Sequence, residues 1–102
     1  MYISDSIIRD NTLRGAASEG LCLNGNGNVI KRNVITSRRL AGLTLEDGQN
    51  NIITNNQITA LNENPPEVVD VNGGPTACEN TWRNNDFSTD SEGDGPNAGC
   101  IR

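Results

Sequence analysis

An eight-residue pattern that occurs four times constrains the fold of this chain more than any other feature. Each copy has Asn or Ser at its first position, Asn at its sixth, and apolar residues at its third and eighth. The copies are residues 6–13, 28–35, 51–58 and 80–87. The sixth-position residues are Asn11, Asn33, Asn56 and Asn85, so the first two intervals are almost equal and the third is longer. Self-similarity with a period in the twenties is typical of a solenoid.

A second block keeps the same spacing. Gly20–Leu23 and Gly42–Leu45 are separated by the same interval as Asn11 and Asn33, and we expect a third copy at Val69–Val71, displaced by an insertion around residues 62–66. The apolar residues are spaced by two, three and two, which indicates short strands joined by tight bends and not a helix. We therefore predict an all-β fold, a parallel β-helix of about four coils.

The predicted solenoid is a single domain covering residues 1–102. Its coils are expected at about 1–20, 21–42, 43–68 and 69–87, followed by a capping tail at 88–102. An Asn repeated at one bend of successive coils would form a ladder, because each side-chain amide can bond the next coil and so avoid the cost of burial. We assign this structural role to Asn11, Asn33, Asn56 and Asn85.

An antiparallel sandwich is the alternative fold. Asn24–Gly25, Asn26–Gly27 and Asn72–Gly73 have the composition of two-residue hairpin turns. A sandwich would not explain, however, why the same columns recur along the chain at a nearly constant interval.

Gly-Leu-x-Leu followed by Asn-x-Ile-x-x-Asn-x-Ile resembles the repeat of the pectate-lyase-like superfamily. The segments 78–87 and 100–102 resemble the last coil and tail of bacterial members. The resemblance implies a right-handed helix of which this chain is the C-terminal part. It also implies a disulfide between Cys78 and Cys100 that holds the tail. It does not specify a function, because such folds include lyases, hydrolases, epimerases, adhesins and scaffolds.

Charge and composition exclude several functions. The net charge is −5 and aromatic residues make up 3%, which argues against binding of nucleic acid. The chain has no His, the commonest general base and metal ligand. No apolar run is long enough to cross a membrane. The N-terminus lacks the pattern of a signal peptide. We expect a secreted or cell-surface protein if a leader is missing, and otherwise a cytoplasmic one with reduced thiols.

Strand alternation predicts which side chains face outward. If Leu21, Leu23, Leu43, Leu45, Val69 and Val71 point inward, then Cys22, Thr44 and Asp70 form one outward column, and Asn24, Glu46 and Asn72 the next. Glu46 and Asp70 are the best candidates for an acid and base pair. Thr44 and Asn72 are candidate binding residues beside them. We assign no metal site and no cofactor, although a calcium ion held by Glu46, Asp47 and Asp70 is left open.

Another predicted outward column contains Arg9, Lys31, Thr54 and Arg83, whose basic members could contact an acidic glycan. Trp82 and Phe87 occupy columns that are aliphatic in earlier coils, so we expect them to fill the end of the core. The short sequences typical of the superfamily's enzymes, such as Asp-Asp, Gly-His-Gly and Arg-x-Lys, are absent.

These features favour a non-catalytic β-helix module for scaffolding or carbohydrate recognition. The alternative is a fragment of a polysaccharide lyase, glycoside hydrolase or epimerase that acts on acidic glycans. Ile3, Ile7 and Ile8 lie in a first coil with no predicted cover, so we also expect a homo-oligomer formed through the N-terminal coils.

Overall fold

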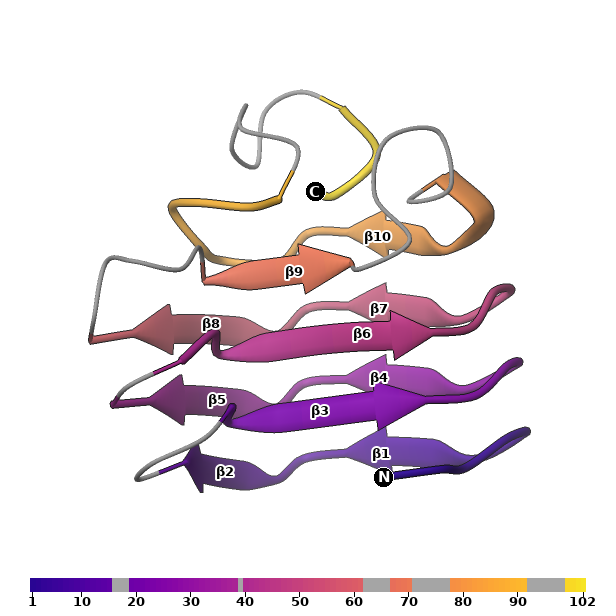
Figure 1. Cartoon of the computed structure of the whole chain (residues 1–102), viewed down its shortest axis with the longest axis horizontal. Helices are drawn as coiled ribbons and strands as arrows, with labels where there is room; N and C mark the ends of the chain where they lie inside the picture. Colours follow the sequence, from indigo (N-terminus) through magenta and orange to yellow (C-terminus); the bar gives the residue numbers. More distant parts are fainter. Residues whose placement is uncertain (16–18, 39, 62–66, 71–77, 92–98) are drawn as a thin grey trace.

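Short parallel strands stack in successive layers along the computed structural model (Figure 1). The structure describes residues 1–15, 19–38, 40–61, 67–70, 78–91 and 99–102. The strands are β1 (Ile7–Arg9), β2 (Thr12–Gly15), β3 (Leu21–Asn24), β4 (Val29–Lys31), β5 (Val34–Ser37), β6 (Leu43–Asp47), β7 (Ile52–Thr54), β8 (Gln57–Ala60), β9 (Val68–Asp70) and β10 (Thr81–Arg83). The two termini lie at opposite ends of the stack.

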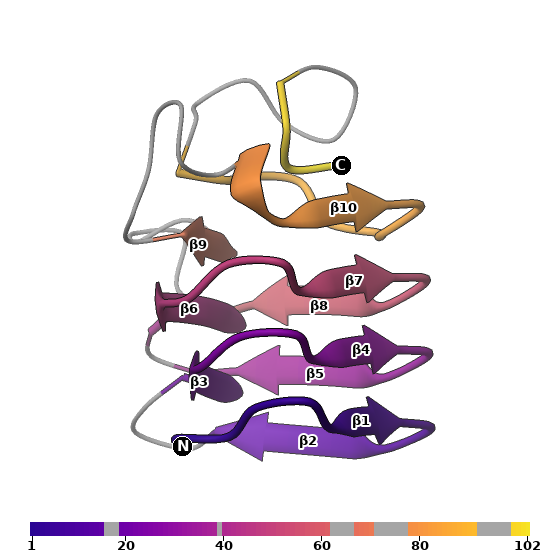
Figure 2. The same ribbon diagram turned by 90° about the vertical axis from the view of Figure 1, so that its right-hand side faces the viewer.

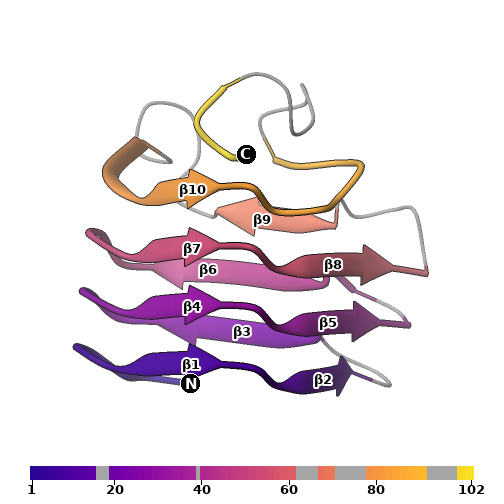
Figure 3. The same ribbon diagram turned by 180° about the vertical axis from the view of Figure 1, so that it is seen from behind.

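The strands form three sheets that enclose a common core (Figure 2). Sheet I has the order β1-β4-β7-β10, sheet II the order β2-β5-β8 and sheet III the order β3-β6-β9. Every pairing between these strands is parallel. The chain therefore visits the sheets in turn, and each coil lies on the one before it, as the view from behind also shows (Figure 3). The predicted parallel β-helix is confirmed, and the antiparallel sandwich is wrong.

The repeat columns of the sequence are the registers of the sheets. In sheet I, Ile8 pairs with Ile30, Ile30 with Ile53, and Ile53 with Trp82. In sheet II, Leu13 pairs with Ile35 and Ile35 with Ile58. The buried members of these two columns are at most 3% exposed, and they are Ile30, Ile53, Trp82, Ile35 and Ile58. Each coil thus adds one layer of apolar side chains to a continuous core.

The ladder is confirmed at Asn33, Asn56 and Asn85, which are buried. The Asn56 Oδ1 accepts from the Asn33 backbone N–H at 2.9 Å, and the Asn56 Nδ2 donates to the Ile30 carbonyl at 3.0 Å. The same Nδ2 also donates to the Asn85 Oδ1 at 3.0 Å. Asn11 is different, because its side chain is exposed and only its backbone N–H donates to Asn33. Its assignment as a buried ladder residue is therefore wrong.

A second ladder occupies the first position of the repeat. Asn28, Asn51 and Asn80 are buried, and the backbone N–H of Asn28 donates to the Asn51 Oδ1 at 2.8 Å. The Asn51 Nδ2 donates to the Asn80 Oδ1 at 2.9 Å and to the Gly25 carbonyl at 3.0 Å. This role was not assigned from the sequence, although the same column of Asn was visible there. Both ladders provide partners for polar groups that the bends bury.

The bends depend on residues with positive φ. Asp10, Arg32, Asn55 and Asn84 adopt φ between 53° and 58° at equivalent positions between sheets I and II. At the bend between sheets III and I, Gly25 and Gly48 have φ of 139° and stack on each other. A Cβ at Gly48 would overlap the Gly25 carbonyl oxygen, and a Cβ at Gly25 would overlap the Ile3 carbonyl oxygen, so this bend requires glycine in both coils. The Asn-Gly pairs therefore turn the chain between sheets and do not form hairpins.

The C-terminal end of the core is closed by three apolar residues. Trp82, Phe87 and Ile101 are at most 5% exposed and belong to the core cluster. The predicted filling role of Trp82 and Phe87 agrees with this burial. The Asn85 Nδ2 also donates to the Arg102 carbonyl at 2.7 Å, so the tail ends one Asn ladder. Part of the predicted tail continues the solenoid, because Asp90 pairs in parallel with Val68.

Cys78 and Cys100 are joined by a disulfide, with their Cα atoms 5.1 Å apart. The bridge connects the entry to β10 with the segment that carries Ile101 into the core. The bridge therefore holds the tail against the last coil.

Candidate functional site

A β-bulge gives the outer face of sheet III its distinctive geometry. Leu23 pairs with Leu45, but the register then shifts and Asn24 pairs with Asp47. Glu46 is thereby an extra residue, and both Glu46 and Asp47 are exposed. Bulges commonly occur beside functional sites because they change the direction of a side chain. The Asn24 Nδ2 donates to the Glu46 Oε2 at 3.5 Å, which links the two coils at this point.

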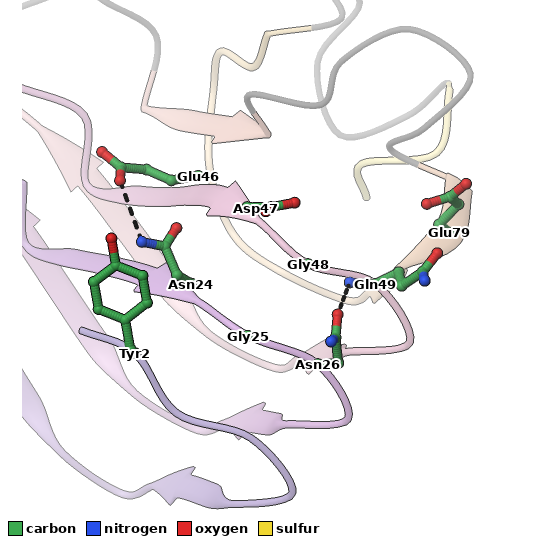
Figure 4. A pocket seen from close by; sticks show the side chains of 9 residues that line it. All are labelled: Tyr2, Asn24, Gly25, Asn26, Glu46, Asp47, Gly48, Gln49 and Glu79. Carbon is green, nitrogen blue, oxygen red and sulfur yellow. Dashed lines mark hydrogen bonds between the residues drawn. The ribbon is translucent and has the colours of Figure 1, made fainter.

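An open pocket of about 700 Å³ lies next to the bulge (Figure 4). We call it the bend pocket, since it follows the bends after β3 and β6. The Asn26 Oδ1 accepts from the Gln49 backbone N–H at 2.8 Å and so holds the two bends together. The lining residues are Tyr2, Asn24, Gly25, Asn26, Glu46, Asp47, Gly48, Gln49 and Glu79.

The lining combines one aromatic ring with amides and carboxylates. Tyr2 is 87% exposed and pairs through its backbone with Asn24. Figure 4 shows the Tyr2 ring below the Asn24 and Glu46 side chains, with Glu79 across the pocket. Three lining residues carry carboxylates and none carries a positive charge. The pocket can therefore donate and accept hydrogen bonds, but it does not favour an anionic ligand.

A second group of side chains lies on the same face of sheet III. The ligand-type atoms of Glu19, Cys22 and Glu46 all lie within 4.8 Å of one another, and we call this set the Cys22 cluster. Burial raises the pKa of the Cys22 thiol, and a hydrogen bond to Glu46 together with the nearby carboxylates of Glu46 and Glu19 raises it further. Cys22 is therefore a weakly reactive thiol at neutral pH.

We expect the titration of Cys22 to report its contact with Glu46. In Glu46→Gln, the Cys22 pKa falls toward the ordinary thiol value, because one negative charge and its hydrogen bond are lost while burial remains. The ultraviolet absorbance of the thiolate, followed against pH with the Cys78–Cys100 bridge intact, measures this change. Glu79→Gln is the matched control and should leave the curve in place. Identical curves for Glu46→Gln and the parent would contradict the contact.

The predicted catalytic pair is not aligned as expected. Asp70 pairs with Leu45 and not with Thr44, because Val68, which is fully buried, takes the place opposite Leu43. The predicted alignment of Val69 and Val71 with the two inward Leu positions is therefore wrong by one residue. The side chain of Asp70 lies outside the described part of the structure. A catalytic role for Glu46 with Asp70, and calcium held by Glu46, Asp47 and Asp70, stay predictions.

The predicted binding residues beside this pair have different outcomes. Thr44 pairs with Cys22 as predicted, but it is only 6% exposed and cannot present its hydroxyl to a large ligand. It lies between Cys22 and Val69 in the same column, and these neighbours shield its small side chain. Asn72 lies outside the described residues.

The predicted basic column is present on sheet I. Arg9 pairs with Lys31, Lys31 with Thr54, and Thr54 with Arg83. Arg9 lies 3.9 Å from the Asp10 carboxylate, which Arg32 engages at 2.8 Å. The Arg32 hydrogen bond lowers the pKa of Asp10. Within the described segments, no carboxylate lies within ion-pair distance of Lys31 or Arg83.

Sequence reasoning missed most of the bend pocket. Tyr2, Asn26, Gln49 and Glu79 were not predicted as site residues, and Glu19 was not grouped with Cys22. A signal existed, because Gly25–Asn26 and Gly48–Gln49 are offset by the same interval as the repeat itself and therefore occupy equivalent bends.

In the part of the chain that the structure describes, no helix is long and apolar enough to span a membrane.

Comparison with known proteins agrees with the stacked parallel sheets. The family model described as "Right handed beta helix region" matches residues 1–95. A search of curated proteins and a search of solved structures each found no match to the chain. Since the family match covers most of the chain and the strands form the parallel coils that it requires, the protein belongs to the right-handed β-helix family.

Proposed function

We propose that this chain is a non-catalytic carbohydrate-binding module of the pectate-lyase-like type, and that the bend pocket binds a neutral sugar. The observation that carries the proposal is the pocket lining, where an exposed Tyr2 ring stands beside amide and carboxylate groups. An aromatic face can cover the apolar face of a sugar ring, while the polar groups bond its hydroxyls. The carboxylates disfavour a negatively charged glycan.

The exposure of the carboxylates supports a binding function more than an enzymatic one. A glycosidase general acid is kept protonated by apolar surroundings. Glu46, Asp47 and Glu79 are all exposed, so none of them lies in surroundings of that kind. A protein of this kind would bind a glycan without cleaving it.

The test is a binding survey with neutral and acidic polysaccharides, by affinity electrophoresis and calorimetry. Tyr2→Ala is expected to weaken binding of the neutral ligand roughly tenfold, because the ring's packing is lost. Gln49→Ala should weaken it less, since only the backbone of Gln49 holds the bend. Lys31→Gln on sheet I is the matched surface control and should leave binding of the neutral ligand unchanged. Binding unchanged in Tyr2→Ala, or release of shorter sugars from the glycan, would contradict the proposal.

The basic column supports acidic glycans as a second class of ligand. Arg9 and Lys31 are directly paired, and like charges at such positions repel each other. An anionic polymer lying along the column would relieve this repulsion. In the same survey, Lys31→Gln and Arg83→Gln should then weaken binding of acidic polysaccharides, while Tyr2→Ala leaves it unchanged.

A further inference from the structure

We propose that Glu19, Cys22 and Glu46 bind a divalent transition-metal ion of the zinc type. The three side chains supply one sulfur and two carboxylate oxygens, all within 4.8 Å of one another. Around tetrahedral zinc, bonds of about 2.0–2.3 Å place ligand atoms roughly 3.3–3.8 Å apart. The atoms that are farthest apart therefore need to approach each other by about 1–1.5 Å to coordinate the ion, which rotation of the two Glu side chains can supply.

The amide of Asn24 provides an independent indication of a ligand. Asn24 is only 9% exposed, and its Nδ2 lies 3.5 Å from the Glu46 Oε2. Its Oδ1 is buried and has no hydrogen-bond partner among the described residues. A buried carbonyl oxygen without a partner is costly. A half-turn of the amide exchanges its two ends and directs the oxygen toward Glu46.

A cation bound to Glu46 would attract the Asn24 Oδ1, whereas the Glu46 carboxylate alone would repel it. Two oxygens that both accept hydrogen bonds repel each other, whereas a metal ion between them attracts both. Asn24 would then be a fourth ligand, completing a tetrahedron with Glu19, Cys22 and Glu46. The bulge is what makes this arrangement available, because it places Glu46 opposite Asn24 as an additional residue.

The donor set determines which ions are suitable. Calcium and magnesium prefer oxygen ligands and gain little from a thiolate. Zinc and cobalt accept both thiolate and carboxylate ligands. The site is therefore distinct from the calcium set considered from the sequence, which contains no sulfur. Because Glu19 and Cys22 belong to the coil of β3 and Glu46 to the coil of β6, the ion would also link two coils.

The test is titration of the full chain with cobalt(II), with the Cys78–Cys100 bridge intact. We expect one cobalt per chain and a near-ultraviolet thiolate-to-cobalt absorption band, which zinc removes by displacement. Cys22→Ser should abolish the band and weaken zinc affinity roughly 100-fold, and Glu19→Gln should weaken it roughly tenfold. Glu79→Gln, in the bend pocket but outside the Cys22 cluster, is the matched control and should bind cobalt normally. Circular dichroism of each variant checks that the fold is retained.

Three results would overturn the proposal: no thiolate band, a band that persists in Cys22→Ser, or calcium that displaces cobalt as well as zinc does. The metal site shares Asn24 and Glu46 with the bend pocket, but the two proposals can be tested separately. Tyr2→Ala should keep its cobalt band even where it loses sugar affinity. A protein that binds cobalt but no glycan would refute the proposed function and leave the metal site in place.

Discussion

Asn56→Leu is expected to destabilise the protein by about 3–5 kcal/mol, because it leaves the buried Asn33 N–H without its acceptor, at about 1–3 kcal/mol, and removes two further buried hydrogen bonds at about 1 kcal/mol each. These two bonds are the ones that the Asn56 Nδ2 donates to the Ile30 carbonyl and to the Asn85 Oδ1. Leu has as many side-chain heavy atoms as Asn and is not smaller, so the variant opens no cavity at this position. Thermal unfolding followed by circular dichroism should show a fall in Tm of roughly 15–30 °C.

Asn11→Leu is the matched control for this prediction. Asn11 occupies the same column, but its side chain is exposed and its backbone N–H, which bonds Asn33, remains in the variant. We expect a change within about 0.5 kcal/mol, as for other surface substitutions. If Asn56→Leu and Asn11→Leu unfold at the same temperature, the ladder is not a major source of stability.

Reduction of the Cys78–Cys100 bridge is expected to cost on the order of 3 kcal/mol, since it releases a constraint on the unfolded chain. The two cysteines are 22 residues apart in the sequence. Ile101, which directly follows Cys100, is buried in the core. Thermal unfolding with and without reductant should differ by roughly 10–20 °C. Cys100→Ser should unfold like the reduced parent.

Thiol counting in denaturant, without reductant, tests the premise directly. One free thiol per chain is expected, from Cys22, which is outside the bridge. Cys22→Ser should keep its sensitivity to reductant. Three free thiols in the parent would show that the bridge is not formed in the protein as isolated.

The layers of the fold could be predicted, because aligning one repeated residue position determines the register of every strand in a sheet. Once Asn33 and Asn56 are aligned, Ile35 and Ile58 must pair, and burial of one face fixes the direction of every side chain in the strand. The basic column on sheet I followed from the same alignment. The Asn28 column is just as regular, but it was assigned no role from the sequence, and its burial and hydrogen bonds appear only in the structure.

The candidate site was harder to predict, because it depends on departures from the repeat. The bulge at Asn24 shifts the pairing by one residue, and no residue type in the sequence marks it. At β9, Val68 and Val69 are both apolar, so alternation alone did not determine which of them points inward. The bend pocket combines residues from four coils, and their relation appears only when the bends are stacked in space.

The strand registers also show where this chain can change in length. Leu21 pairs with Leu43 and Leu43 with Val68, so the second of these two coils is the longer one. The coil that separates Ile52 from its partner Thr81 is longer still. Apart from Glu46, which the bulge accommodates near the end of β6, the added residues fall in the connections between strands, because an extra residue within a regular strand would reverse the faces of those that follow. Evolution of such a chain can therefore vary the corners, where the bend pocket lies, without disturbing the layers beneath them.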